Sequence, residues 1–160
     1  MGQVDVVRVI DEARGFLNAL RELCIPPAIA WIGIQAMPDG RDRAIDLWIQ
    51  ADQERTYGPR TAIEGLSVRR FLRTHLFSRI TATDEQKTKL ERRFREYIDL
   101  AADADSGEVH FERLSTNESI LIEIECSDFE LHGAIVFSLT NYIVVLALGT
   151  NNKPDRKSVV

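Results

Sequence analysis

The sequence lacks the short patterns that identify many enzyme classes. Its only cysteines, Cys24 and Cys126, exclude a disulfide-rich scaffold and any Cys-x-x-Cys motif. Both occupy apolar positions that are typical of inert buried thiols. The chain also has no glycine-rich phosphate loop and no nucleophile elbow around a serine. We therefore expect no cofactor and no catalytic centre of these types.

Basic residues are almost missing from one long segment, and acidic residues are scarce in the segment before it. Residues 55–95 hold eleven Lys and Arg against four Asp and Glu, whereas residues 96–152 hold one Arg against eleven acidic residues. The whole chain has a net charge of −5, and its basic helical surface has no interleaved aromatics, which argues against nucleic acid as a partner. Charges at Asp5, Arg8 and Asp11 interrupt any apolar leader, so we expect a cytoplasmic protein.

One long uncharged run does occur, from Leu131 to Thr150, and it reaches the roughly twenty residues that a membrane-spanning helix needs. Polar residues from Ser138 to Asn141 lie near its centre, and its flanks are β-branched and aromatic. The run therefore predicts a β-hairpin with a tight turn at 139–142, with a tail anchor as the alternative. Both faces of this hairpin are apolar, so both should be covered.

Hydrophobic periodicity predicts three helices, with apolar stripes that run over 6–24, 68–80 and 90–101. Ser67 is the expected N-cap of the second helix, and Thr83 with Gln86 has capping-box spacing at the start of the third. Two favourable i,i+4 ion pairs are predicted on the third helix, Glu85 with Lys89 and Glu91 with Arg95.

Alternating residues predict the strands. Residues 29–36 and 43–51 form an expected hairpin around the Pro-Asp-Gly turn, and residues 107–112 and 120–126 form another. With the uncharged hairpin, the chain reads as one α+β domain over 1–152 with a polar tail at 153–160. Its expected antiparallel sheet has about six strands, in the order helix, two strands, two helices, four strands. This order is similar to that of PAS and profilin-like sensor folds, in which a helical segment interrupts an antiparallel sheet.

Acidic residues and a histidine meet on the polar face of the predicted hairpin 107–126. Its register places His110 opposite Glu123, and Glu112 and Glu125 lie on the same face. Imidazole and carboxylates are ligands of divalent metals, so these four residues are a candidate metal site. The simpler alternative is a solvated acidic face.

Three further features are candidates for contacts with partners or for chemistry. The basic helical surface predicts anion or partner binding by Arg69, Arg70, Arg73, Lys89, Arg92 and Arg93. His75 lies on an apolar stripe and is either a ligand or base in a pocket or a structural core residue. His132 lies on the smaller-residue face of the last hairpin, with no nucleophile at a recognisable spacing. Three helices are too few to cover the sheet twice unless the N-terminal helix covers the second face. Val136, Ile143 and Val145 on that face therefore form a predicted homodimer interface.

Together these patterns predict a non-catalytic sensory, regulatory or protein-interaction module of the cytosol. The alternative function is a small metal-dependent hydrolase that uses the acidic sheet face.

Overall fold

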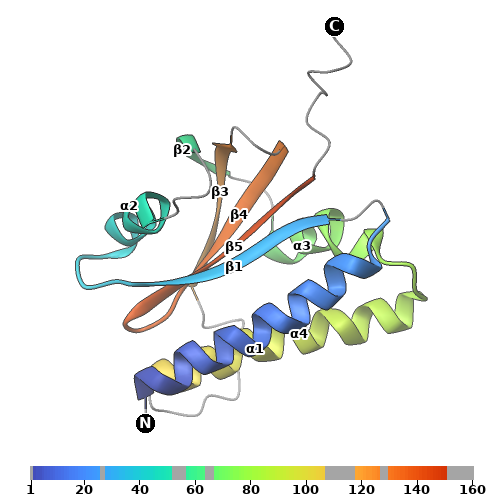
Figure 1. The fold of residues 1–160 in the computed structure, drawn as a ribbon, viewed down its shortest axis with the longest axis horizontal. Helices are drawn as coiled ribbons and strands as arrows, with labels where there is room; N and C mark the ends of the chain where they lie inside the picture. Colours follow the sequence, from blue (N-terminus) through green and yellow to red (C-terminus); the bar gives the residue numbers. More distant parts are fainter. Residues whose placement is uncertain are drawn as a thin grey trace, which may run out of the picture.

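Five antiparallel strands form one sheet with helices on both faces (Figure 1). The structure, a computed structural model, describes residues 2–25, 28–51, 57–63, 67–106, 118–126 and 130–150. Its elements are α1 (Gly2–Leu23), β1 (Ala28–Ala36), α2 (Arg41–Ala51), β2 (Tyr57–Ile63), α3 (Val68–His75), the 3-10 turn η1 (Phe77–Arg79), α4 (Asp84–Ser106), β3 (Glu118–Cys126), β4 (Glu130–Ser138) and β5 (Tyr142–Thr150). The strand order is β1-β5-β4-β3-β2, which confirms the α+β class.

The larger part of the core lies on one side of the sheet, which we call the helix-pair face. Here α1 and α4 run side by side across the sheet (Figure 1), and α3 packs beside them. Leu17 of α1 and Phe94 and Ile98 of α4 are fully buried against Leu146 and Leu148 of β5. The predicted apolar stripes of these helices are therefore the surfaces that build this core.

Within the described ranges, one short helix covers the opposite side, which we call the α2 face. Ala44, Ile45 and Trp48 of α2 belong to a second buried cluster with β3, β4 and β5. Trp48 lies so close to β1 that a Cβ atom on Gly33 would come within 2.7 Å of the indole nitrogen Nε1. A glycine at this position is what allows the indole to rest against the strand.

The prediction of a strand over 43–51 was wrong, because this segment is α2. Ile45, Leu47 and Ile49 alternate as in a strand, yet the buried positions are 44, 45 and 48, the spacing of a helix. The Pro-Asp-Gly turn does form, with Gly40 at a φ of 97°, and the first helical hydrogen bond runs from Ala44 N–H to the Gly40 carbonyl. The turn therefore leads into a helix, and the observed order differs from the sensor-like order.

The strand β2 is not among the elements predicted from the sequence. Gly58 and Pro59 are poor strand formers, but β2 is an edge strand that pairs with β3 alone. Its register shifts between Tyr57 and Arg60, around the proline. An edge and an irregularity are the two places where a strand accepts proline. The predicted strand 107–112 lies outside the described residues.

The uncharged run 131–150 forms the predicted hairpin of β4 and β5. Its turn closes where expected, with the Leu139 N–H donating to the Tyr142 carbonyl at 2.9 Å. Asn141 at the tip is tied to α4, since its backbone N–H donates to Asp105 Oδ2 at 2.7 Å. Among the helices within the described ranges, none has the length and apolar character to cross a membrane.

The predicted helix starts are confirmed in detail. Ser67 Oγ accepts a hydrogen bond from Arg70 N–H at 3.1 Å, and the Thr83 and Gln86 side chains each bond the other's backbone N–H. These contacts satisfy amide groups that a helix leaves unpaired at its start. They fix where α3 and α4 begin, and thus how the two helices present their outer side chains.

The outer edge of β1 is occupied by side chains from α1. The Met37 N–H donates to the Asn141 carbonyl, so the odd-numbered residues of this segment bond the neighbouring strand β5. Because alternate residues of a strand direct their backbone groups to opposite sides, the carbonyls of the even-numbered residues point away from β5. Two of these carbonyls accept from arginines: Ile32 from Arg14, at 3.1 and 3.3 Å, and Ala28 from Arg21, at 3.2 Å. The arginines satisfy backbone groups that an edge strand otherwise exposes.

Candidate anion-binding site

A buried carboxylate lies between α3 and α4. Glu91 is only 3% exposed and lies on the side of α4 that also buries Phe94 and Ile98. A carboxylate in such a position needs charged or hydrogen-bonding partners, because desolvation otherwise makes it costly. Those partners come from α3, the helix that the Ser67 cap begins.

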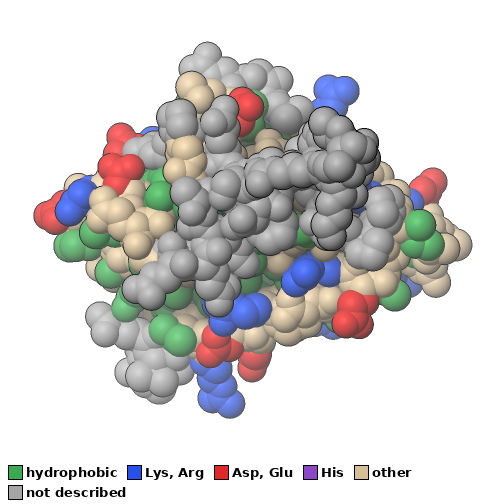
Figure 2. Space-filling view, turned by 45° about the horizontal axis from the view of Figure 1, so that its top comes forward, with side chains coloured by type: hydrophobic (Ala, Val, Ile, Leu, Met, Phe, Trp, Pro, Cys, Tyr) green, Lys and Arg blue, Asp and Glu red, His purple; other side chains and the backbone are tan. Residues whose placement is uncertain are grey.

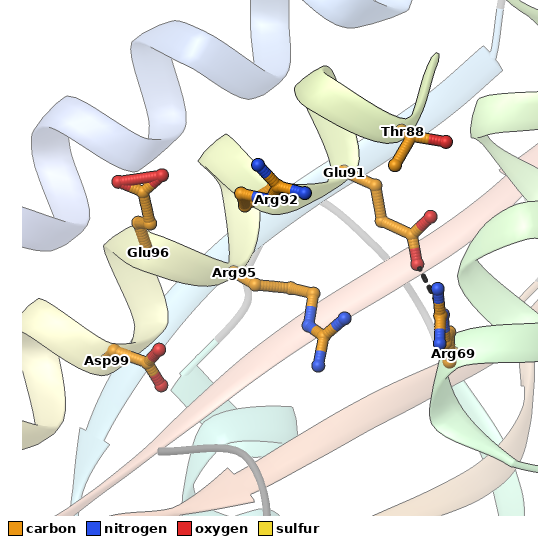
Figure 3. A pocket seen from close by; sticks show the side chains of 7 residues that line it. All are labelled: Arg69, Thr88, Glu91, Arg92, Arg95, Glu96 and Asp99. Carbon is orange, nitrogen blue, oxygen red and sulfur yellow. Dashed lines mark hydrogen bonds and ion pairs between the residues drawn. The ribbon is translucent and has the colours of Figure 1, made fainter. Parts of the chain in front are cut away.

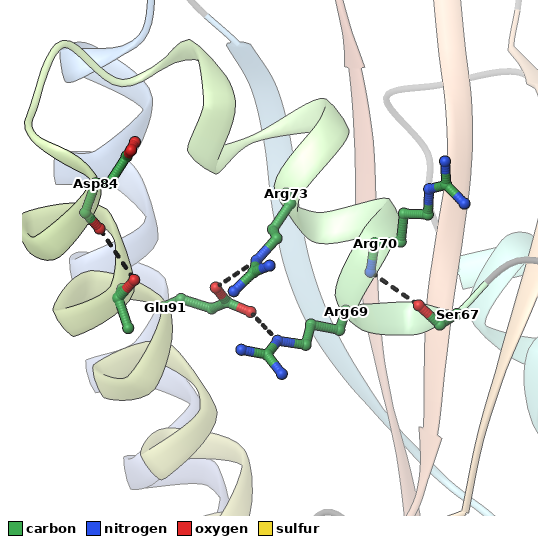
Figure 4. Close-up of polar contacts among 7 residues, drawn as sticks. Ser67, Arg69, Arg70, Arg73, Asp84 and Glu91 are labelled. Atoms are coloured by element: carbon green, nitrogen blue, oxygen red, sulfur yellow. Dashed lines mark hydrogen bonds and ion pairs between the residues drawn. The ribbon is translucent and has the colours of Figure 1, made fainter.

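Two arginines of α3 hold this carboxylate, one on each oxygen. Arg69 Nε lies 3.3 Å from Glu91 Oε1, and Arg73 Nε lies 3.1 Å from Oε2. Figure 4 shows both side chains reaching from α3 across to α4. Each guanidinium uses its Nε edge, while about half of each arginine side chain stays exposed. Within the described residues, the terminal nitrogens of both arginines make no hydrogen bond or ion pair, so they can serve as donors to a ligand.

Two open hollows adjoin this contact and share Glu91 and Thr88. One, of about 310 Å³, is lined by Arg69, Thr88, Glu91, Arg92, Arg95, Glu96 and Asp99 (Figure 3). The other, of about 360 Å³, is lined by Arg73, Phe77, Ser78, Asp84, Lys87, Thr88 and Glu91. We call the two hollows and the Arg69–Glu91–Arg73 contact between them the arginine cleft.

Charges of both signs are mixed on one face of the molecule. On the face shown in Figure 2, Lys and Arg side chains lie among Asp and Glu side chains, and hydrophobic side chains occur in small separate groups. In the arginine cleft, guanidinium groups from α3 and α4 line adjoining hollows, and in Figure 3 the Arg95 side chain extends along the cleft toward α3. Convergent arginines of this kind are typical of sites that bind phosphate or carboxylate groups.

The structure brings together three of the six predicted anion-binding residues, Arg69, Arg73 and Arg92. The other three do not line the cleft. Lys89 pairs with Glu85 at 3.6 Å, as predicted, and Arg93 lies 3.9 Å from Glu96. Arg70 is exposed on α3.

Glu91 and Arg95 are among the cleft residues that sequence reasoning missed. It paired them with each other as an i,i+4 ion pair, whereas Glu91 bonds the two arginines of α3. A signal was present, because Glu91 is spaced three and seven residues before Phe94 and Ile98 and so falls on the buried stripe of its helix. A carboxylate on such a stripe indicates a partner from another element.

The predicted metal site is only partly described. His110 and Glu112 lie outside the described residues, and so does the side chain of Glu125. Glu123 is exposed on β3. Within the ranges that the structure describes, no group of three or more His, Cys, Asp or Glu side chains is arranged to hold a metal ion. The four-residue metal site therefore stays a prediction.

The residues of the predicted dimer interface are part of the core. Val136, Ile143 and Val145 are each 0% exposed and pack in the cluster beneath α2. The expectation that only the N-terminal helix could cover this face was wrong. This helix, α1, packs on the helix-pair face, and α2, which the sequence predicted as a strand, covers the other face. The homodimer stays a prediction, but without this surface as its argument.

His75 and His132 form a stacked pair between α3 and β4. Their ring centroids are 4.2 Å apart, and Phe71 packs against His75 at 4.7 Å. A register shift between Leu131 and Gly133 turns His132 toward α3, so its predicted place on the smaller-residue face was wrong. Burial lowers the pKa of His75 to about 4, and the charges of His132 and Arg79 act in the same direction.

Cys24 is free and buried, and its Sγ lies 3.4 Å from the Leu20 carbonyl. Burial raises the pKa of this thiol, which agrees with the prediction of an inert cysteine.

Comparison with protein-family models gave no match, and comparisons with curated proteins and with solved structures gave no significant match. The arginine cleft is therefore the main basis for a functional proposal.

Proposed function

We propose that this protein is a non-catalytic regulatory or protein-interaction module of the cytosol, and that it binds an anionic group of its partner in the arginine cleft. The observation that carries this proposal is the contact of Glu91 with the Nε atoms of Arg69 and Arg73. The buried carboxylate fixes both guanidinium groups and leaves their terminal nitrogens for a ligand. Such preorganisation lowers the entropic cost of binding.

The polar groups around the cleft support binding rather than catalysis. The Ser78 hydroxyl donates to the Thr74 carbonyl and the Thr88 hydroxyl to the Asp84 carbonyl, each at 2.9 Å. A nucleophilic hydroxyl would need a general base within hydrogen-bonding distance instead of a backbone acceptor. Because both hydroxyls already donate to backbone carbonyls, the donors to a bound anion are the N–H groups of the arginines.

Thermal unfolding in different salts tests the proposal. Sodium sulfate or sodium citrate, compared with sodium chloride at equal ionic strength, should raise the melting temperature of the wild-type protein through binding to the folded state. We expect the double variant Arg92→Gln, Arg95→Gln to lose about 3 °C of this increase. These two arginines are suitable because neither bonds Glu91, so their removal leaves the buried carboxylate paired.

The matched control is Arg43→Gln on α2, an exposed residue outside the cleft. It should retain the whole wild-type response, including the general stabilisation that sulfate gives to folded proteins. An equal response of the wild-type protein and the double variant to both anions would refute an anion site in the cleft.

A further inference from the structure

We infer that the group bound in the arginine cleft is a phosphate monoester in its dianionic form. This inference rests on the proposed function, because it names the ligand of the same site. Three properties of the cleft favour this ligand: its free donors, its charge and its lack of an aromatic surface.

The donors suit an anion with several oxygens. Only the Nε atoms of Arg69 and Arg73 bond Glu91, and within the described part of the chain no contact is found for their terminal nitrogens. Two guanidinium groups held on opposite oxygens of one carboxylate present several N–H groups from neighbouring positions. A phosphate monoester has three terminal oxygens that accept such bonds, whereas a carboxylate has two.

The charge of the cleft matches a dianion. Five cationic groups line the two hollows, the guanidinium groups of Arg69, Arg73, Arg92 and Arg95 and the ammonium group of Lys87, together with the carboxylates of Asp84, Glu91 and Asp99. A fourth acidic residue, Glu96, has Arg93 within 3.9 Å as its own counter-charge. The cleft thus keeps two positive charges, which a phosphate monoester above its second pKa of about 6 would neutralise and a single carboxylate would not.

The lining argues against a nucleotide base as part of the ligand. Among the described lining residues of the two hollows, Phe77 is the one aromatic side chain, and it is only 2% exposed. Bases bind to proteins largely by stacking on exposed aromatic rings, and the described lining offers no such ring. The ligand is therefore a compact phosphate group, either on a small molecule or on a phosphorylated side chain of a partner protein.

Calorimetric titration of the full chain tests this inference. The probes are inorganic phosphate, an end-blocked Gly-phosphoserine-Gly peptide and the matched Gly-glutamate-Gly peptide. At pH 7.5 we expect at least one phosphate probe to bind about tenfold more tightly than the glutamate peptide. Preference for the phosphopeptide would identify a partner protein as the source, and preference for inorganic phosphate would identify a small molecule.

Variants and pH sharpen the result. Arg95→Gln should weaken phosphate binding by about tenfold, while Arg43→Gln on α2 should bind as the wild type does. At pH 5 the phosphate becomes a monoanion, so its affinity should fall by several fold while that of the glutamate peptide changes little.

Equal affinities for the phosphopeptide and the glutamate peptide would overturn the phosphate inference and leave the anion site standing. If no probe binds and the melting temperature does not respond to sulfate or citrate, both proposals fail together. Unchanged phosphate affinity in Arg95→Gln would also overturn the inference, because the ligand would then bind elsewhere.

Discussion

The two faces of the sheet are covered in different ways. On the helix-pair face, three helices with clear apolar stripes build a large core, and α3 and α4 keep their outer sides for charge. On the α2 face, one helix of 11 residues covers strands whose inward side chains are small or β-branched, such as Ala134, Val136 and Val145. The comparison shows that one short helix can complete a core where the inward side chains of the strands are small or β-branched, while the thicker layer carries the arginine cleft.

The largest expected effect is on the thinly covered face. Val145→Asp places a carboxylate in the α2-face core with no partner, so we expect a loss of more than about 4 kcal/mol in the free energy of unfolding. Val7→Asp on α1 is the matched control, because Val7 is 45% exposed and its change should cost about 0.5 kcal/mol or less. Chemical denaturation measures both.

Light scattering of the same proteins decides the question of the dimer. If the wild type were a dimer and Val145→Asp a folded monomer, Val145 would lie at an interface, and its place in the chain's own core would be wrong.

Smaller changes in stability are expected at two glycines, Gly33 beneath α2 on the α2 face and Gly15 of α1 on the helix-pair face. Gly33→Ala would push a Cβ atom to 2.7 Å from Trp48 Nε1, and we expect a loss of about 1–3 kcal/mol as the indole shifts. Gly15→Ala on α1 meets nothing within 4 Å and should stabilise the protein by about 0.5–1 kcal/mol through helix propensity. Urea denaturation with tryptophan fluorescence measures both, and a neutral Gly33→Ala would show that α2 packs loosely.

The smallest effect concerns the attachment of α3 to the sheet. The pKa of His75 is about 4 in the folded protein, against an ordinary value of 6.5, so the unfolded chain binds the proton first as pH falls. The stability is therefore complete above pH 6.5 and declines toward pH 4. Since the ring is only partly buried, solvent screens part of the effect, and we expect a loss of about 1 kcal/mol.

The groups that face His75 are His132 on β4 and Arg79 of η1, both of which oppose its protonation. Melting temperatures of the wild type and His75→Gln between pH 7 and pH 4 should diverge, with the wild type falling more steeply. An NMR titration that gives His75 a pKa of 6.5 or above would contradict the buried, stacked ring.

The sequence predicted the elements whose apolar pattern, caps and turns all indicate the same structure, and it missed the elements that depend on tertiary contacts. α1, α3 and α4 have long stripes and capping residues such as Ser67, and the hairpin of β4 and β5 has a polar turn between apolar strands. The eleven residues of α2 fit either a helical or a strand pattern, and the helix is the conformation in which Ala44, Ile45 and Trp48 pack together in the α2-face core. β2 depends on its pairing with β3, because its Pro59 opposes an intrinsic strand.

In the candidate site, too, local patterns could be predicted and tertiary contacts could not. The basic residues of α3 and α4 could be predicted from composition, and three of them do meet in the cleft. The role of Glu91 could not, because local charge patterns pair it with Arg95 on its own helix. Its actual partners lie 18 and 22 residues away, and only the packing of α3 on α4 brings them together.

The hydrogen bonds from Arg14 and Arg21 to the outer carbonyls of β1 should reduce aggregation while the chain folds. Every pairing between β1 and β5 joins residues more than 100 positions apart, so this ladder closes late. The two arginines reach β1 from 18 and 7 positions away and can occupy its edge much earlier. An uncharged strand such as AIAWIGIQA would otherwise be a template for other unfinished chains. Replacing both arginines with alanine should thus lower the yield of refolding and increase turbidity, even where the folded state keeps most of its stability.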